Sequence, residues 1–228
     1  MQGKIILAID DDPQMLRLLE HIFSKEGAQV CTAAGGQEGL RQFYKYRPHL
    51  VILDVMMPEI NGWQVCSRIC QMSDVPIIFL SARRDEAEII HGLDVGAIGY
   101  VTKPFSPPVL VARARAALRQ TELAPGTEKT GTYRDDYLTV DLDASRVTVR
   151  GERVKLTKTE YRILAYLVEN AGRVLTRQQI LEYVWGREYR DSIDYTHVYM
   201  WRLRQKLEED PQNPRYLLTK HGLGYRFQ

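Results

Sequence analysis

Residues 6–13 read Ile-Leu-Ala-Ile-Asp-Asp-Asp-Pro, a short apolar run that ends in three consecutive acidic residues. A continuous apolar run of this length, bounded by polar residues, is typical of a buried strand in a parallel sheet. Asp12 followed by Pro13 is typical of a helix start, because a carboxylate caps the first turn and proline fits the first helical position. The sequence therefore predicts a buried strand that leads directly into a helix.

The same alternation of strand and helix patterns continues to residue 120. Segments of helical period separate short apolar runs, which indicates a parallel sheet with helices on both faces. We expect a doubly wound α/β domain of five strands and five helices over residues 1–120. The expected strands are Lys4 to Ile9, Ala28 to Thr32, Leu50 to Leu53, Ile77 to Leu80 and Ile98 to Val101.

The pattern changes after a Pro- and Gly-containing segment at residues 121–132, which we interpret as a linker. Residues 133–228 combine short alternating strands, helical segments and a terminal hairpin, which predicts an α+β winged helix-turn-helix domain. Two capping-box patterns, Thr157 to Glu160 and Thr176 to Gln179, predict helix starts. The expected strands are Leu138 to Val140, Arg146 to Val149, Arg153 to Leu156, Tyr216 to Thr219 and Tyr225 to Phe227, with a turn at His221 to Gly224.

Composition and charge narrow the function classes. A chain of 228 residues with 44% apolar and 26% charged residues fits two globular domains. It contains no apolar run of membrane-spanning length and no signal-like start, so we expect a cytoplasmic protein. Cys31, Cys66 and Cys70 lack nearby histidines, which favours reduced, buried thiols over a metal site. Residues 124–228 carry 18 basic and 15 acidic side chains, a weak indication of a polyanion partner.

Polar side chains stand at the predicted strand ends, where ligands of open α/β sheets bind. They are Asp10 and Asp11 after the first strand, Asp54 after the third, Ser81 after the fourth and Lys103 after the fifth. Carboxylates that meet there repel one another and require a cation, and hard oxygen ligands suit Mg²⁺. Asp54 would then be a nucleophile toward phosphorus, with Lys103 and Ser81 contacting the phosphoryl oxygens.

Four motifs in this half resemble, in order and spacing, the receiver domain of bacterial response regulators. They are Ile-Leu-Ala-Ile-Asp-Asp-Asp-Pro, Leu-Asp-Val-Met-Met-Pro with Asn-Gly, Leu-Ser-Ala-Arg and Tyr-Val-Thr-Lys-Pro-Phe. The resemblance implies a flavodoxin-like fold with Asp54 as the phosphoacceptor of a sensor histidine kinase. It implies that Mg²⁺ is held by Asp10, Asp11, Asp54 and the backbone carbonyl of Met56. It also implies that Ser81 and Tyr100 form a switch pair and that Lys103 binds phosphate before a cis peptide to Pro104.

Each of these residues also has an ordinary structural explanation. An aspartate pair after a strand often only caps the next helix, and a lone lysine is usually solvated. The phosphoryl-acceptor hypothesis is favoured because all the residues fall at successive strand ends of one sheet.

The segment Asp191 to Leu207 combines helical periodicity with a basic and aromatic second face. We expect Thr196, Met200, Leu203 and Leu207 to pack on the core. We expect Val198, Trp201, Arg202 and Gln205 to point outward, with Tyr199 and Lys206 beside them. Such a stripe suits a DNA major groove, with phosphates bound by Arg202, Arg204, Lys206 and Lys220. The alternative is a helix face that is merely solvated.

A second set of motifs is similar to the effector domain of OmpR/PhoB-type response regulators. They are Leu-Thr-Lys-Thr-Glu-Tyr, Asn-Ala-Gly-Arg-Val-Leu-Thr-Arg, Val-Trp-Gly, Arg-Leu-Arg-Gln-Lys-Leu and His-Gly-Leu-Gly-Tyr-Arg-Phe. The resemblance implies a recognition helix at Tyr195 to Leu207, a loop at Trp185 to Asp191 that meets RNA polymerase, and a minor-groove wing. The partner would be double-stranded DNA with direct or inverted repeats. His221, where relatives often carry arginine, and Trp201 depart from the family pattern.

The surface through which such regulators dimerise after phosphorylation is also altered in this sequence. Arg113 and Arg119 keep its basic half, but Ile98 and Gly99 replace two acidic residues. Val109 replaces another acidic residue, and His91 stands where a basic one is frequent. We therefore expect a homodimer that is weak, more apolar or shifted, because several ion-pair partners are missing.

Two other functions are compatible with parts of the sequence. A phosphatase or phosphotransferase would use Asp54 for turnover, but Met56 stands where a general acid is needed. A constitutive DNA-binding protein with a vestigial receiver would not need to retain the full acidic set. We therefore expect a non-enzymatic, phosphorylation-controlled transcription regulator.

Overall fold

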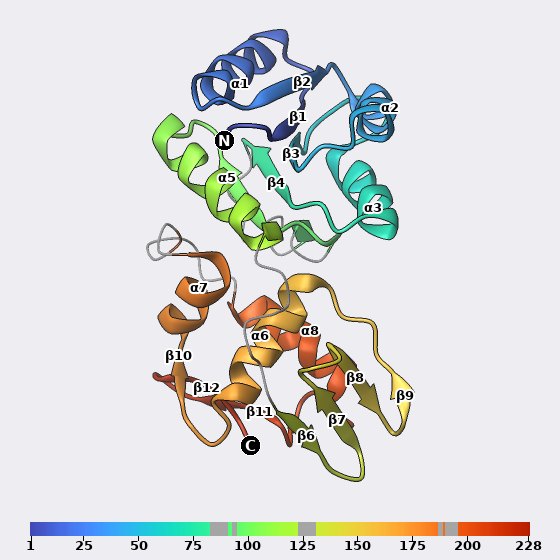
Figure 1. Cartoon of the computed structure of the whole chain (residues 1–228), viewed down its shortest axis with the longest axis vertical. Helices are drawn as coiled ribbons and strands as arrows, with labels where there is room; N and C mark the ends of the chain where they lie inside the picture. Colours follow the sequence, from blue (N-terminus) through green and yellow to red (C-terminus); the bar gives the residue numbers. More distant parts are fainter. Residues whose placement is uncertain (83–90, 93–94, 123–130, 187–188, 190–195) are drawn as a thin grey trace. The chain divides into compact units, whose positions relative to one another are not determined.

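The computed structural model describes residues 1–82, 91–92, 95–122, 131–186, 189 and 196–228. The chain divides into two compact units, Met1–Glu122 and Leu123–Gln228 (Figure 1). Residues 123–130 of the expected linker lie outside the described residues. Within the described ranges, no helix is both long and apolar enough to cross a membrane.

The first unit is built on a five-stranded parallel sheet of order β2-β1-β3-β4-β5. The strands are β1 (Ile5–Ile9), β2 (Gln29–Ala33), β3 (Leu50–Asp54), β4 (Ile77–Ser81) and β5 (Gly99–Thr102). This order confirms the doubly wound, flavodoxin-like fold. The strand order reverses between β1 and β3, so the carboxyl ends of these two strands form the expected ligand crevice.

Helices cover both faces of this sheet (Figure 1). They are α1 (Pro13–Lys25), α2 (Gly36–Tyr46), α3 (Gly62–Met72) and α5 (Pro107–Glu122). Helices α1 and α5 share one face, where Leu19, Phe23 and Leu110 are fully buried in a single core cluster with the central strands. The fifth expected helix, between β4 and β5, falls mostly on residues 83–90 and 93–94, outside the described residues.

The start of α1 confirms the prediction that the strand within residues 6–13 leads directly into a helix. The Asp12 side chain accepts a hydrogen bond from the backbone N–H of Gln14 at 2.7 Å, and Pro13 occupies the first turn. Strand β1 is buried over Ile6–Ile9, as a strand covered on both faces must be. The chain is therefore fixed on both sides of Asp10 and Asp11.

The second unit has two antiparallel sheets and three helices within its described residues. The four-stranded sheet comprises β6 (Thr132–Arg134), β7 (Leu138–Asp141), β8 (Arg146–Val149) and β9 (Glu152–Arg153). The helices are α6 (Lys158–Glu169), α7 (Arg177–Trp185) and α8 (Thr196–Leu207). The three-stranded sheet comprises β10 (Leu175–Thr176), β12 (Gly224–Phe227) and β11 (Leu217–Lys220). This arrangement confirms the winged-helix fold.

Local sequence patterns predicted most helices and strands of this unit correctly. Both predicted capping boxes are present, at Thr157 with Glu160 and at Thr176 with Gln179. The predicted strand at Arg153 to Leu156 is wrong beyond Arg153, because the chain leaves the sheet there to enter the Thr157 cap. Apolar alternation alone does not show where the strand ends and the approach to the capping box at Thr157 begins.

The three cysteines are free thiols. Cys66 is fully buried on α3, with its Sγ 3.9 Å from the Sγ of Cys70. The hydrogen bond with Cys70, together with burial, raises the pKa of Cys66 well above its ordinary value. A raised pKa disfavours the reactive thiolate. The expectation of buried thiols holds for Cys66, whereas Cys31 and Cys70 are only partly buried.

Candidate functional site

Four of the predicted site residues lie at the carboxyl edge of the parallel sheet. Asp10 follows β1, Asp54 ends β3, Ser81 ends β4 and Lys103 follows β5. Asp10 is 1% exposed and Asp54 is 5% exposed, although both side chains are charged. Buried charges of this kind are rare in proteins unless they are paired.

Lys103 supplies that pairing. Its Nζ atom lies 2.7 Å from Oδ2 of Asp10 and 2.6 Å from Oδ1 of Asp54, and it donates a hydrogen bond to each. The ammonium group therefore holds together two carboxylates that would otherwise repel each other. A place for a cation exists between Asp10 and Asp54.

Burial and charge pairing oppose each other in this group. Burial raises the pKa of Asp54, and the hydrogen bond and charge of Lys103 only partly reverse that effect. Burial lowers the pKa of Lys103, but its hydrogen bonds to Asp10 and Asp54 outweigh burial and raise it overall. The ammonium group is therefore held firmly in its charged form, while the Asp54 carboxylate is poorly solvated.

The loop after β3 holds Asp54 in place. The backbone N–H of Met56 donates a hydrogen bond to Oδ2 of Asp54 at 2.7 Å. The N–H of Gly62 donates to the carbonyl of Val55 at 3.0 Å, closing the loop. A Cβ atom at Gly62 would lie 2.1 Å from the backbone oxygen of Asp54, so only glycine permits this approach.

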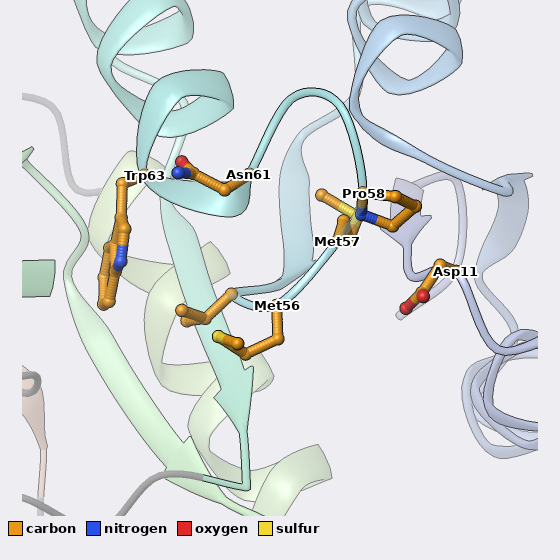
Figure 2. A pocket seen from close by; sticks show the side chains of 7 residues that line it. Asp11, Met56, Met57, Pro58, Asn61 and Trp63 are labelled. Atoms are coloured by element: carbon orange, nitrogen blue, oxygen red, sulfur yellow. The ribbon is translucent and has the colours of Figure 1, made fainter.

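Asp11 occupies a different position from its neighbour Asp10. It is exposed and lines a hollow of about 550 Å³ together with residues of the β3–α3 loop (Figure 2). The other lining residues are Val55, Met56, Met57, Pro58, Asn61 and Trp63. Within the described ranges, no three carboxylate, imidazole or thiol side chains gather as a ready metal site. In this structure the acidic group therefore consists of Asp10 and Asp54 around Lys103, with Asp11 at its margin.

The expected switch residues are both buried. Ser81 is fully buried, and its carbonyl accepts a hydrogen bond from the N–H of Lys103 at 2.6 Å. The ring of Tyr100 is 2% exposed and lies 6.2 Å from Phe79 and 6.4 Å from Trp63, measured between centroids. The Lys103–Pro104 peptide is cis, as the family resemblance implies.

The predicted dimer residues differ in how accessible they are. Val109 is 44% exposed, whereas Ile98 is partly buried against the receiver core. The His91 ring lies 4.9 Å from that of Trp63. Arg113 is half-buried, and its Nη1 donates to the backbone carbonyl of Tyr100 at 2.7 Å, while Arg119 is exposed. One arginine of the predicted ion-paired surface is thus bound to its own chain.

Helix α8 presents fewer outward side chains than predicted. Thr196, Met200, Leu203 and Leu207 are buried, as expected. The prediction that Val198 points outward, with Tyr199 beside the exposed stripe, is wrong, because the two residues are 4% and 1% exposed. Tyr199 packs on Trp185 with centroids 5.2 Å apart, and burial of such apolar surface is favourable. Trp201, at 56%, and Gln205 remain exposed.

Three basic residues of α8 contact other parts of the same unit. Arg204 donates to the carbonyl of Leu217 and to Oγ1 of Thr219 on β11. The Nζ of Lys206 lies 2.7 Å from Oε2 of Glu160, and Nε of Arg202 lies 3.8 Å from its Oε1. The helical pattern could not reveal these contacts, because their partners come from α6 and β11.

The hairpin of β11 and β12 forms the wing. Lys220 is half-buried, while His221 and Leu223 at the tip are exposed, Leu223 by 64%. Gly224 has a φ of +151°, and a Cβ atom there would lie 2.0 Å from the carbonyl oxygen of Leu175. Glycine is therefore required where β12 pairs with β10.

Sequence reasoning missed two residues that matter for the sites. Trp63 links the hollow beside Asp54 to the buried ring of Tyr100. Glu160 was recognised only as a helix-capping residue, although it is fully buried beside two cations of α8. A capping-box glutamate inside an apolar helix face is a usable signal, since a buried carboxylate needs a partner.

Both halves of the chain match known families. Residues 6–115 match the response regulator receiver domain, and residues 151–227 match the C-terminal domain of transcriptional regulatory proteins. The chain is 44% identical to the probable transcriptional regulator ycf27 of Cyanophora paradoxa, over 99% of this chain and 96% of that protein. It is 41% identical to the transcriptional regulatory protein KdpE of Mycobacterium tuberculosis, over 98% and 99%.

A solved structure agrees with this assignment. The response regulator DrrB of Thermotoga maritima, an OmpR/PhoB homologue, shares 34% identity with a TM-score of 0.53, over 100% of this chain and 99% of that chain. The relatives are named as transcription regulators and not as enzymes. The chain belongs to the OmpR/PhoB-type response regulators, two-component transcription regulators in which phosphorylation of a receiver controls a winged-helix DNA-binding domain.

Proposed function

We propose that Asp54 is the residue that accepts the phosphoryl group, and that a sensor histidine kinase supplies it. The observation that carries this proposal is the position of the Asp54 carboxylate at the sheet edge, 2.6 Å from the Lys103 ammonium group. A cation beside the nucleophile offsets its repulsion of an incoming phosphoryl group. Asp10 shares this position and this pairing, but the resemblance to receiver domains assigns Asp10 to the metal ion and Asp54 to the phosphoryl group.

The transfer would use the groups at this site, the phosphodonor and a bound Mg²⁺. An oxygen of Asp54 forms a bond to phosphorus while the bond from phosphorus to the donor's imidazole nitrogen breaks, and that nitrogen keeps the electron pair. Lys103 is placed to pair with the transferred oxygens. The hydroxyl of Ser81, at the neighbouring strand end, would donate a hydrogen bond to one of them.

The oxygen donors suit Mg²⁺ in kind. The carboxylates of Asp10 and Asp54 lie close enough for one ammonium group to bond to both, at 2.7 and 2.6 Å, so a cation can bring their charges together. Asp11 and the backbone carbonyl of Met56 would complete a set of hard oxygen ligands. When bound, Mg²⁺ would supply charge that offsets the phosphoryl oxygens. Asp10 and Asp11 would bind it, and Met56 would keep Asp54 oriented.

Five residues of the winged-helix unit are the proposed DNA contacts. Trp201 and Gln205 are exposed on α8, with Arg202 half-buried beside them, while Lys220 and His221 lie on the wing. Gln and Arg side chains can read base edges in the major groove, and the wing would follow a phosphate backbone. The target would be double-stranded DNA that contains direct or inverted repeats of a half-site. The protein would act in the cytoplasm.

Homodimerisation and contact with RNA polymerase are further parts of the proposal. Most of the expected polymerase loop, at residues 187–188 and 190–191, lies outside the described residues. For the dimer, Val109 is exposed, and the guanidinium of Arg113 already donates a hydrogen bond to the carbonyl of Tyr100 in its own chain. Both observations favour a more apolar contact between phosphorylated receivers. Sedimentation with a phosphoryl mimic tests this. Tight, salt-sensitive dimers that disappear in Arg113→Ala would contradict it.

Tryptophan fluorescence tests the phosphoacceptor assignment, because Trp63 lines the hollow beside Asp54 and stacks near Tyr100. Beryllofluoride with Mg²⁺ should change the emission of the wild-type chain but not that of Asp54→Asn. Trp63→Phe is the control that assigns the signal. A response that survives in Asp54→Asn would exclude Asp54 as its origin.

A further inference from the structure

The buried carboxylate of Glu160 faces the recognition helix. It lies on α6, is fully buried, and has its Oε2 atom 2.7 Å from the Nζ of Lys206 on α8. The same Oε2 accepts a hydrogen bond from the backbone N–H of Thr157, so the helix cap and the ion pair share one oxygen. The Nζ of Lys206 also donates to the carbonyl of Lys155 at 3.3 Å.

A second contact fixes the same helix to the wing. The Arg204 guanidinium donates to the carbonyl of Leu217 through Nε at 2.9 Å and through Nη2 at 2.6 Å. Nη2 also donates to Oγ1 of Thr219 at 2.7 Å. Arg204 and Lys206 are thus hydrogen-bonded to β11 and to the start of α6, respectively, and both lie on the last turns of α8.

Basic residues on a recognition helix suggest contacts to DNA phosphates, but these two are engaged elsewhere. If Lys206 moved to a phosphate, the Glu160 carboxylate would remain buried without the cation that donates to it. Breaking a buried pair by removing one partner is strongly unfavourable. Its Oε1 has no hydrogen-bond partner among the described residues, and Arg202, at 3.8 Å, does not reach hydrogen-bonding distance.

We propose that Glu160 is a positioning residue for DNA recognition, which holds Lys206 and thereby sets the orientation of α8, together with the Arg204 contact to β11. Lys206 then contributes to affinity through the placement of Trp201 and Gln205 and not through a phosphate contact. This inference rests on the proposed DNA contacts of the winged-helix unit. It removes Lys206 and Arg204 from the phosphate-binding residues expected from the sequence.

Salt dependence separates the two roles of Lys206. Each phosphate contact adds about 0.9 to the slope of log K against log salt. If Lys206 bound a phosphate, the affinity deficit of Lys206→Met would be about three- to four-fold larger at 50 mM than at 200 mM salt. A positioning role predicts the same fold loss at both salt concentrations.

The experiment measures binding of the full-length chain to a 30-base-pair duplex by fluorescence anisotropy. Lys220→Met removes a cation of the wing and is the matched control variant. It should reduce the slope of log K against log salt. A slope for Lys206→Met equal to wild type supports the proposal, and a slope smaller by about 0.9 overturns it. Failure of the wild-type chain to bind the duplex would instead contradict the DNA-binding function itself.

Thermal unfolding gives a second readout that does not involve DNA. Lys206→Met should lower the Tm of the winged-helix transition by about 4 to 8 °C, because it leaves Glu160 charged without its hydrogen-bonded cation. Glu160→Gln combined with Lys206→Met should recover part of this loss, since glutamine is neutral and can still cap α6. An unchanged Tm for Lys206→Met, or a further loss in the double variant, would overturn the positioning role.

Discussion

The receiver and the winged-helix unit each bury a charged group, but with opposite signs and opposite consequences. In the receiver, one cation, Lys103, lies between two carboxylates at the open edge of the sheet. In the second unit, one carboxylate, Glu160, lies beside two cations of α8 in the domain interior. The chain neighbours of the first group, Asp11 and Val55, line a hollow. The second group lies between two helices.

This difference shows how one physical rule serves two purposes. A buried charge needs a partner, and the partner can be exchangeable or fixed. Lys103 retains 20% of its side-chain exposure, so a phosphoryl group can reach it. Glu160 retains none, so its pairing is structural. The variants that test the comparison change the backbone of each unit first, then the charges themselves, and then a separate polar cluster.

The largest losses are expected at two glycines, one in each unit. A Cβ atom at Gly62 would lie 2.1 Å from the oxygen of Asp54, and one at Gly224 would lie 2.0 Å from the oxygen of Leu175. Gly62→Ala and Gly224→Ala should each destabilise their unit by about 3 kcal/mol, because backbone must move. Urea unfolding measures both losses. Gly172→Ala is the control, because Gly172 has a positive φ but open space around its Cβ position, so this variant shows the cost of backbone strain without a steric clash.

Lys103→Met tests the cation of the receiver. Its removal leaves the buried carboxylates of Asp10 and Asp54 without their shared partner. We expect a loss of about 2 kcal/mol in the free energy of unfolding, less than for a fully buried pair because Lys103 is partly exposed. Adding Asp10→Asn should restore part of it. Equal stability of Lys103→Met and wild type would show that Lys103 does not stabilise this pair.

These variants also show how far sequence reasoning reaches. Asp10, Asp54, Ser81 and Lys103 could be predicted because sheet topology brings strand ends together whatever the side chains do. Glu160 and Arg204 could not, because a helical wheel describes one helix and omits partners on other elements. The predictions for Val198 and Tyr199 were wrong for the same reason. Trp63 was not assigned to the site because an aromatic side chain carries no charge that marks it as a ligand.

A smaller effect is expected at Asp135, which holds a separate polar cluster of the winged-helix unit. Its Oδ2 accepts a hydrogen bond from the hydroxyl of Tyr216 at 2.8 Å and lies 3.0 Å from Nη2 of Arg215. Burial and the Asp135 hydrogen bond raise the pKa of Tyr216. Tyr216→Phe should cost about 1 kcal/mol in the winged-helix unit and leave the receiver unchanged. A loss in the receiver transition alone would contradict this assignment of the hydrogen bond to the winged-helix unit.

The smallest effect concerns the pH dependence of receiver stability. Burial raises the pKa of Asp54 above its ordinary 3.8, so the Asp54 carboxyl group holds its proton more tightly in the native state than in the unfolded chain. Its contribution to stability is present below the unfolded pKa and is lost as pH rises through the folded pKa. Asp54→Asn should therefore be more stable than wild type at pH 7, with the difference shrinking toward pH 4. A difference that grows on acidification would contradict the raised pKa.

The central claim is that Asp54 receives phosphorus while Lys103 and a divalent cation compensate its charge. Mass spectrometry of the chain after incubation with acetyl phosphate and Mg²⁺ tests it most directly. We predict one added phosphoryl group, located on the peptide that contains Asp54, which does not form when Mg²⁺ is chelated before the donor is added and is absent from Asp54→Asn. A phosphoryl group on another residue, or none on Asp54 with Mg²⁺ and donor in excess, would contradict it.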